Sequence, residues 1–237
     1  MQSVFKAPLA LTVLHSVEKG RLSLDETVRF RASDRILPHA YSPLQDEFPG
    51  AEVDVPVSRL LSLAVSLSDN VAADILLRLI GGPSVVDRYL RQCGIDGFHI
   101  QDDEAALHRD ESRQYRNWFE PSGAVHFLRM LNDRPPVTAE HAALLLGWMQ
   151  GSTRGSQRLG GQLPAGTIVM HKAGTSFTVD GLSAATNDIG LITLPDGRRL
   201  AIAVFLTDSK ANDGTRDSVI ARIARAAYDA AVETERR

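Results

Sequence analysis

The hydrophobic and polar residues of this chain follow a helical period through most of its first 150 residues. Apolar residues recur at intervals of three to four, as at Leu9, Val13 and Val17, which places them on one face of an α-helix. Gly20 follows that stretch, and glycine is common just after a helix ends. The pattern predicts helices over residues 3–19, 58–67, 71–80, 83–92, 121–131 and 138–150.

The pattern changes after residue 150. Residues 167–176, 184–194 and 199–207 are typical of strands, and Pro195-Asp196-Gly197 is a turn signal between the last two. Residues 218–232 return to an amphipathic helical pattern. We therefore predict a single α+β domain, with a helical lobe over residues 1–150 and an α/β lobe over residues 151–237 in which an antiparallel sheet packs on the terminal helix.

Composition and charge exclude several classes of function. The chain has 237 residues, of which 43% are hydrophobic and 23% charged, as in an ordinary globular protein. A net charge of -3 without a Lys/Arg cluster gives no basis for binding nucleic acid or a membrane surface. The single Cys93 cannot form an internal disulfide, and no apolar run reaches the roughly 18 residues of a transmembrane helix. The histidines show no metal-ligand spacing, so we expect no metal and no cofactor.

The first motif with candidate chemistry is Ser3-Val4-Phe5-Lys6, at the head of the first predicted helix. A lysine one turn after a serine lies on the same helix face, so its amine can approach the hydroxyl. If desolvation keeps that amine neutral, it can accept the proton of Ser3 and make the hydroxyl a nucleophile. The four-residue pattern is common by chance, so it needs support from elsewhere in the chain.

Two further motifs supply that support. Ser68-Asp69-Asn70 lies between two predicted helices, where its simplest interpretation is the N-cap of the second helix. The segment from His171 to Ser176 ends a predicted strand, where a lysine such as Lys172 is usually a solvated edge charge. Gly174 nevertheless lets the backbone approach another group closely. We interpret His171 as support for this strand rather than as a metal ligand.

Together, in this order and spacing, the motifs resemble those of the serine β-lactamases and penicillin-binding proteins. The likeness extends beyond the motifs and covers essentially the whole chain. It is similar to class A β-lactamases of the PER-like extended-spectrum branch, through residues 1–6, 114–118, 163–167, 171–176, 184–188 and 194–198. The resemblance implies hydrolysis of penicillins and cephalosporins, and hence antibiotic resistance.

The resemblance implies four catalytic residues. Ser3 would attack the β-lactam carbonyl with Lys6 as a proton partner, and Ser68 would relay a proton to the leaving nitrogen. Glu104 aligns with the glutamate that activates water for deacylation, although Asp103 and Glu111 are its nearest rivals and a plain loop carboxylate is the alternative. Whether Lys6 or Glu104 activates Ser3 stays open. Position 108 carries histidine in place of the usual asparagine, which is also typical of the PER-like branch.

Five residues are implied in substrate binding. Asn70 would bond the side-chain amide of the substrate, and Lys172 would supply positive potential toward its carboxylate. Arg158 aligns with an arginine that serves the same carboxylate. Thr175 would provide one backbone N–H of the oxyanion hole, together with that of Ser3. Ser176 completes the expected set.

The chain departs from the family pattern in two places. Ala173 replaces a hydroxyl residue, which removes one donor to the substrate carboxylate at a cost of roughly 1 kcal/mol. Class A enzymes carry a signal peptide, a helix and two strands before the nucleophile, and we expect these to be missing here. Met1 would be an internal methionine taken as the start, or the chain would be truncated or a degenerate remnant, and we favour the first. We therefore expect an open edge on the strand over residues 199–207, a frayed Ser3 and poor activity. The full-length relative should be periplasmic or secreted, whereas this chain would stay in the cytoplasm if it were translated from Met1.

Two other functions remain open at this point. A D-alanyl-D-alanine peptidase shares the three motifs but lacks an equivalent of Glu104. A non-catalytic relic or sensor would bind a β-lactam, or become acylated, without turnover. β-Lactam preference, inhibitor sensitivity and oligomeric state are not predicted.

Overall fold

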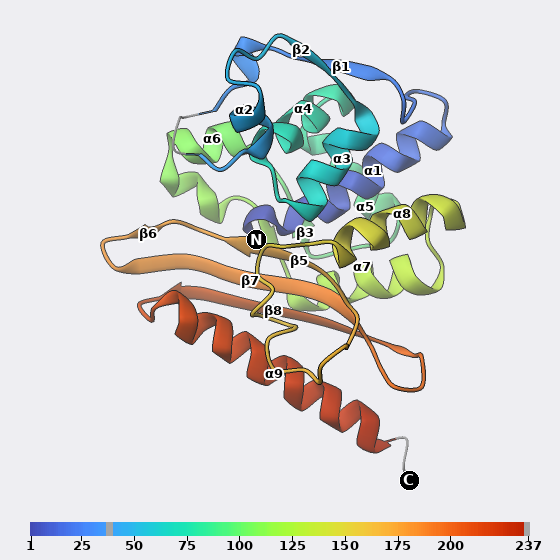
Figure 1. The fold of residues 1–237 in the computed structure, drawn as a ribbon, viewed down its shortest axis with the longest axis vertical. Coiled ribbons are helices and arrows are strands. Elements are labelled where there is room, and N and C mark those ends of the chain that lie inside the picture. Colours follow the sequence, from blue (N-terminus) through green and yellow to red (C-terminus); the bar gives the residue numbers. More distant parts are fainter. Residues whose placement is uncertain (37–39, 235–237) are drawn as a thin grey trace.

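The computed structural model describes residues 1–36 and 40–234, which form a helical part and a sheet with a long helix on its other side (Figure 1). The helical part contains α1 (Lys6–Glu18), α2 (Pro43–Glu47), α3 (Val57–Ser66), α4 (Asn70–Ile80), α5 (Pro83–Gln92), α6 (Glu104–Arg109), α7 (Pro121–Asp133) and α8 (Ala139–Gln150). It also contains the short 3-10 turns η1 (Gln2–Phe5), η2 (Ala32–Asp34) and η3 (Glu111–Tyr115), and the paired strands β1 (Thr27–Phe30) with β2 (Val53–Pro56) and β3 (Phe98–His99) with β4 (Trp118–Phe119).

The larger sheet is antiparallel and is centred on β7 (Leu182–Thr193). On one side β7 pairs with β5 (Val169–Thr175) and, beyond its end, with β6 (Thr178–Val179). On the other side it pairs with β8 (Arg199–Ser209), which has no second strand partner among the described residues. The expected open edge is therefore present on β8.

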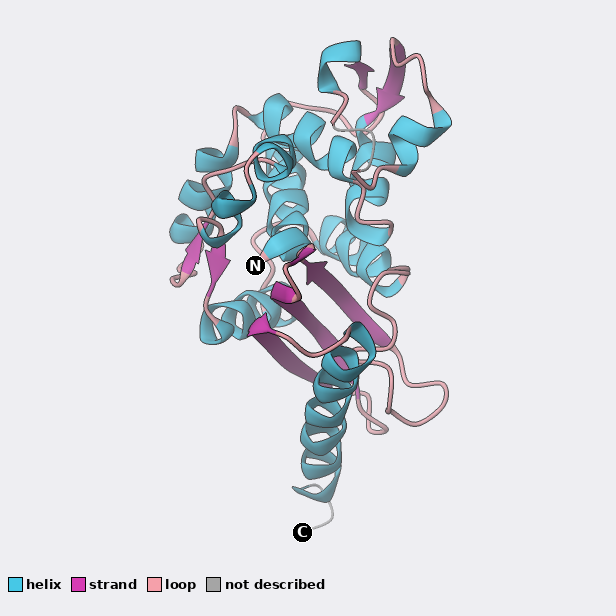
Figure 2. Ribbon diagram, turned by 90° about the vertical axis from the view of Figure 1, so that its left-hand side faces the viewer, coloured by secondary structure: helices cyan, strands magenta, loops and turns pink. Residues whose placement is uncertain are grey.

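The helix α9 (Asp213–Glu233) covers the face of the sheet opposite the other helices (Figure 2). It begins before the predicted residue 218 because the Asn212 side chain accepts a hydrogen bond from the Thr215 N–H and caps the helix there. The remaining predicted helices and strands are present with small shifts at their ends. Missing from the prediction are α2, α6 and the two small sheets, which are too short to show a period.

Two hydrophobic cores hold these layers together. In the larger one, residues 6–14 of α1 are buried on all sides, and Leu9, Leu11 and Leu14 are fully inaccessible to solvent. Each such side chain contributes about 1.5–3 kcal/mol through burial. This core continues onto the sheet through residues such as Met170 and Ile189, so the two lobes are not independent. The smaller core lies between the sheet and α9.

The first residues of the chain pack between the lobes. The Met1 amine donates a hydrogen bond to the Asn117 carbonyl (2.9 Å), and the Asn187 side chain donates to the Met1 carbonyl (3.2 Å). The turn η1 contacts both β5 and β7. This differs from the expected fraying, because the backbone polar groups of this segment have partners in both lobes.

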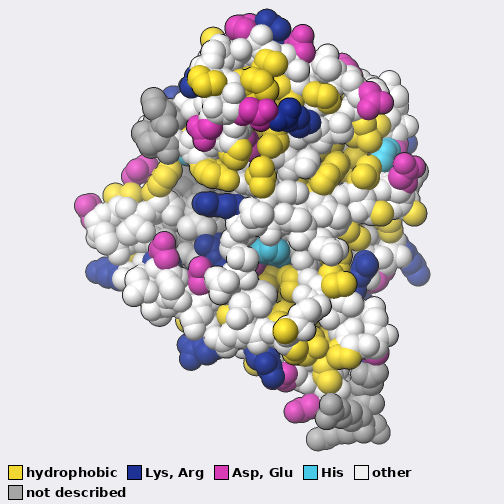
Figure 3. All heavy atoms as spheres, in the orientation of Figure 1, with side chains coloured by type: hydrophobic (Ala, Val, Ile, Leu, Met, Phe, Trp, Pro, Cys, Tyr) yellow, Lys and Arg dark blue, Asp and Glu magenta, His cyan; other side chains and the backbone are white. Residues whose placement is uncertain are grey.

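The charged side chains on one face of the molecule are mixed by sign. On the face shown in Figure 3, basic and acidic side chains are interspersed rather than gathered by sign. None of the helices in the described ranges combines the length and the apolar character that a membrane crossing requires.

Candidate active site

The three sequence motifs meet where the helical part faces the sheet. Ser3 lies in η1, and Lys6 begins α1 directly after it. Ser68 lies in the turn between α3 and α4, and Asn70 begins α4. Lys172 lies on β5, against which η1 packs. The fold thus gathers residues that are more than 100 positions apart in the chain.

Ser3, Lys6 and Glu104 form one hydrogen-bonded cluster. The Ser3 hydroxyl donates to Glu104 Oε1 (3.3 Å), and Lys6 Nζ lies 3.0 Å from the same oxygen. Lys6 is fully buried, and its Nζ also donates to the Ser68 carbonyl (2.8 Å) and to Asn70 Oδ1. Three acceptors thus surround a group that has three N–H donors when it is an ammonium. A buried ion pair is tolerated under these conditions because every donor is satisfied.

Glu104 lies at the start of α6, where two other carboxylates, from Asp74 of α4 and from the N-cap Asp103, accept hydrogen bonds from the backbone. The Asp74 side chain accepts hydrogen bonds from the backbone N–H groups of Glu104 and Ala105 (both 2.8 Å). Asp103 is the N-cap and accepts from the Ala106 N–H (2.7 Å). Burial raises the pKa of Asp74 well above its usual range, and the nearby charges of Asp103 and Glu104 raise it further.

Asp74 was not among the predicted site residues. The available signal was an aspartate between apolar residues of the helix, four positions after Asn70 and so on the same helix face. Of the rivals to Glu104, Asp103 is occupied as a cap, and Glu111 lines the cleft from η3. Only Glu104 among these three has a hydrogen bond with Ser3 in the described structure.

The Ser68-Asp69-Asn70 segment both caps α4 and supplies side chains to the site. Asp69 caps α4 by accepting from the Ala72 N–H (2.9 Å), as the simple interpretation predicts. Ser68 has a φ of 61°, a left-handed backbone conformation that is strained for a residue with a Cβ. Its hydroxyl accepts a hydrogen bond from Lys172, whereas the Asn70 side chain accepts one from Lys6.

Lys172 is fully buried beneath Ser68. Its Nζ donates to Ser68 Oγ and to the Ala173 carbonyl (both 2.9 Å). Burial, reinforced by the positive charge of Lys6, lowers the pKa of Lys172 well below its usual range. The adjacent His171 is buried and bonded to Asp188 (2.9 Å), so it stabilises the sheet beside Lys172.

Gly174 makes the contact between β5 and η1 possible. A Cβ at this position would lie 2.6 Å from the Met1 carbonyl oxygen and 3.1 Å from the Ser3 nitrogen. Only glycine therefore allows this approach. The Ser3 N–H consequently lies beside the backbone of residues 174–175, where the oxyanion hole is predicted.

Arg158 is almost completely engaged by its neighbours. Its Nη1 donates to the carbonyls of Gly174 (3.0 Å) and Asn187 (2.9 Å), and its Nη2 donates to Thr175 Oγ1 (2.7 Å). Its Nε forms an ion pair with Asp217 (2.7 Å). The guanidinium therefore holds β5 against β7 and Asp217 and does not project freely into the cleft.

Thr175, the last residue of β5, and Ser176, which follows it, lie in different environments. Thr175 is exposed and lines the cleft. Ser176 also lines it, but its side chain is largely buried, and its hydroxyl accepts a hydrogen bond from the Ala185 N–H (2.9 Å). The Ser176 hydroxyl therefore fixes the end of the strand against β7.

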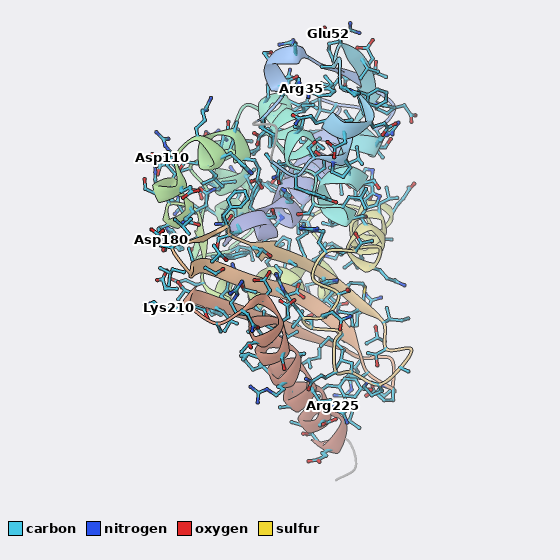
Figure 4. The ribbon with its side chains drawn as sticks, turned by 60° about the vertical axis from the view of Figure 1, so that its left-hand side comes forward. Arg35, Glu52, Asp110, Asp180, Lys210 and Arg225 are labelled. Carbon is cyan, nitrogen blue, oxygen red and sulfur yellow. The ribbon has the colours of Figure 1, made fainter. Side chains whose placement is uncertain are left out.

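A cleft of about 320 Å³ opens over these residues. One wall is formed by α6 and η3, which lie on the same side of the molecule as the β6–β7 turn; Asp110 and Asp180 mark the two segments in Figure 4. The His108 ring meets the half-exposed Phe177 edge to face across this wall (centroids 5.3 Å apart). The lining includes Ser3, Tyr41, Ser68, Asn70, Glu104, Leu107, His108, Arg154, Arg158, Thr175, Ser176, Phe177 and Asp217.

Comparison with known proteins gives matches along almost the whole chain. The model of the β-lactamase enzyme family matches residues 1–231. The extended-spectrum β-lactamase PER-1 of Pseudomonas aeruginosa is 43% identical over 228 residues, which are 96% of this chain and 74% of that protein. The β-lactamase VEB-1 of the same species is 38% identical over 231 residues, which are 97% and 77% of the two chains.

Comparison of the fold with solved structures also gives a β-lactamase. The crystal structure of a β-lactamase from Chitinophaga pinensis matches with a TM-score of 0.94 at 42% sequence identity. The match covers 98% of this chain and 85% of that one. The predicted α+β architecture is confirmed.

Proposed function

The chain belongs to the class A serine β-lactamase family, within its PER-like branch, and on this premise we propose that it hydrolyses penicillins and cephalosporins through an acyl-enzyme on Ser3. The observation that carries the proposal is the cluster in which the Ser3 hydroxyl donates to Glu104 and Lys6 contacts the same carboxylate. Residues 1–237 act as one catalytic domain, with the cleft between its lobes.

Acylation begins when Ser3 Oγ bonds to the carbonyl carbon of the β-lactam. Its proton passes to Glu104, because the hydroxyl already points to that carboxylate whereas Lys6 has other partners for its N–H groups. The ring C–N bond breaks, and the nitrogen takes a proton from Ser68, which Lys172 replaces across 2.9 Å. At this stage one proton has passed from Ser3 to Glu104, and another from Lys172 through Ser68 to the nitrogen. Glu104 and Ser68 both line the cleft, so before deacylation Glu104 gives its proton to solvent and Ser68 takes one from solvent for Lys172.

The developing oxyanion lies between the N–H groups of Ser3 and Thr175. Gly174 brings these two backbone segments together. Two preorganised donors of this kind each contribute a few kcal/mol in acyl transfer. The ordered packing of η1 against β5 is what holds this geometry.

Substrate orientation depends on the remaining side chains of the cleft. Since Asn70 Oδ1 accepts from Lys6, its amide N–H groups are left to meet a carbonyl of the substrate. Since Thr175 Oγ1 accepts from Arg158, its own O–H is left to donate to the substrate carboxylate. That donor compensates for the hydroxyl lost at Ala173. Ser176 contributes by holding the end of β5.

Deacylation separates this activity from that of a penicillin target. Glu104 takes a proton from a water molecule, whose oxygen bonds to the acyl carbon. The bond between this carbon and Ser3 Oγ then breaks, and Glu104 returns the proton to Oγ, so that the serine hydroxyl is restored. A general base of this kind contributes about 10²–10⁴-fold. The hydrogen bond between Ser3 and Glu104 favours this over a peptidase or a non-catalytic relic. A periplasmic or secreted location for the whole protein stays a prediction.

Mass spectrometry of the purified chain mixed with benzylpenicillin tests the proposal, together with the rate of substrate loss. We expect a transient adduct on Ser3, no adduct in Ser3→Ala and a persistent adduct in Glu104→Gln. A persistent adduct in the unaltered chain would favour a penicillin target or a sensor. Slow turnover would support the prediction of poor activity, and the absence of any adduct would contradict the proposed function.

A further inference from the structure

We propose that Arg154, stacked on Tyr41 at the mouth of the cleft, is a further arginine that contacts the substrate carboxylate, in addition to the expected Arg158, which also positions Thr175. This inference rests on the proposed function and deepens it. It assigns a specificity-determining residue outside the recognised motifs. Within the described part of the chain, Arg154 differs from Arg158 and Lys172 in having both free N–H groups and an uncompensated charge.

Arg158 has little left to offer an anion. Four hydrogen bonds occupy a guanidinium that has five N–H groups, and only 6% of the residue is exposed. Its charge is paired with Asp217, a carboxylate that itself lines the cleft. An incoming carboxylate would therefore meet a neutralised pair rather than a free cation.

Lys172 is likewise a poor sole partner for the carboxylate. It is fully buried and does not line the cleft, and two of its hydrogen bonds go to Ser68 and to its own chain. The lowered pKa of Lys172 further weakens its hold on a positive charge as the pH rises. An anionic substrate in a cleft that Glu111 also lines is favoured by a permanent, accessible cation.

Arg154 has these properties. It lies in the segment after α8, is exposed and lines the same cleft as Ser3 and Thr175. Within residues 1–36 and 40–234, its guanidinium has no ion pair or hydrogen bond. It is instead held over the Tyr41 ring, with Cζ 4.5 Å from the ring centroid. A stacked guanidinium keeps its N–H edge free for a carboxylate.

Tyr41 places this cation relative to the reacting groups. The backbone carbonyl of Tyr41 accepts a hydrogen bond from the Asn70 N–H (3.4 Å), which ties it to the Ser68-Asp69-Asn70 segment. The stack thus joins the helical lobe to the residues that follow α8 at the cleft mouth. A carboxylate bound by Arg154 would enter on the side that Ser68 and Thr175 also line.

The decisive experiment compares a cephalosporin that has a free carboxylate with its methyl ester. For Arg154→Gln we expect kcat/KM for the acid to fall about tenfold, mainly through KM, because one charge-assisted contact is lost. The value for the ester should not change. Tyr41→Ala should reproduce part of this loss, whereas Tyr41→Phe, which keeps the ring, should not. Arg158→Gln should lower kcat for both substrates, because residues 174–175 of the oxyanion hole lose their support, and should weaken the acid further, because Thr175 also donates to the carboxylate.

The matched control is Arg129→Gln, which removes the same charge from the exposed face of α7 away from the cleft. It should leave both substrates unaffected. Equal losses for the acid and the ester in Arg154→Gln, or no loss for either, would overturn the inference.

A binding measurement separates this inference from the proposed function. Equilibrium binding of benzylpenicillin to Ser3→Ala, with and without Arg154→Gln, requires no turnover. Weaker binding in the double variant supports the role of Arg154 even if the chain hydrolyses nothing. Equal binding in the two proteins, or none in either, counts against it.

Discussion

The floor and the rim of the cleft are built in opposite ways. On the floor, Lys6 and Lys172 are fully buried, and their N–H groups meet acceptors from several elements. On the rim, Tyr41 and Phe177 are 39% and 49% exposed and are held by single stacking contacts. The floor therefore fixes the chemistry to within a narrow geometry, whereas the rim can change with little cost to folding and so adjusts which substrates bind.

The largest effect should come from the floor. Glu104→Gln keeps the shape of the side chain but removes the base, so the deacylation rate should fall on the order of 10³-fold. The burst and the steady-state rate of a chromogenic cephalosporin measure acylation and turnover separately. A steady-state rate close to that of the unaltered chain would assign the base to another residue.

Gly174→Ala should damage stability and activity together. The added Cβ would approach the Met1 carbonyl oxygen to 2.6 Å, and overpacking of this kind costs about 1–3 kcal/mol. Thermal unfolding and kcat/KM are the measurements. Gly147→Ala is the control, since no atom lies within 4 Å of a Cβ there and the helical position gains about 0.5–1 kcal/mol. Equal stability of the two variants would show that η1 does not press on β5.

Lys172 gives the floor a pH dependence that the rim arginine lacks. Its folded pKa is depressed, so the unfolded chain binds more protons in the interval up to the usual lysine value, and stability should rise with pH across that interval. Lys172→Met should flatten this rise, as measured by denaturant unfolding at several pH values. In activity, kcat/KM for anionic substrates should fall once the pH passes the lowered pKa. An alkaline limb at the ordinary lysine value would contradict the assignment.

The smallest effect should come from the rim. Phe177→Ala removes an edge-to-face contact with His108 but leaves the floor untouched. Stability should change by no more than about 0.5 kcal/mol, as for most surface substitutions. We expect KM to change while kcat stays the same, measured for substrates with side chains of different bulk. A marked fall in kcat would show that the rim supports Glu104.

The sequence by itself determined the long helices, the main strands and the three motifs. These depend on local spacing: apolar residues repeat along α3 and α4, and Ser3 and Lys6 lie one turn apart wherever a helix forms. The family likeness then located Glu104 in a short helix that has no period of its own. It could also indicate Arg158 as a residue that serves the carboxylate, because alignment preserves position.

Only the tertiary structure decided what these side chains contact. Asp74 reaches the Glu104 backbone across 30 positions of sequence, and Lys172 reaches Ser68 across 104. The partners that occupy Arg158 come from β5, β7 and α9, so no local pattern could reveal that its donors are taken. The stacking of Arg154 on Tyr41 is equally non-local. Hydrogen-bond saturation and burial arise from several distant segments at once, and a periodic pattern records only neighbours along the chain.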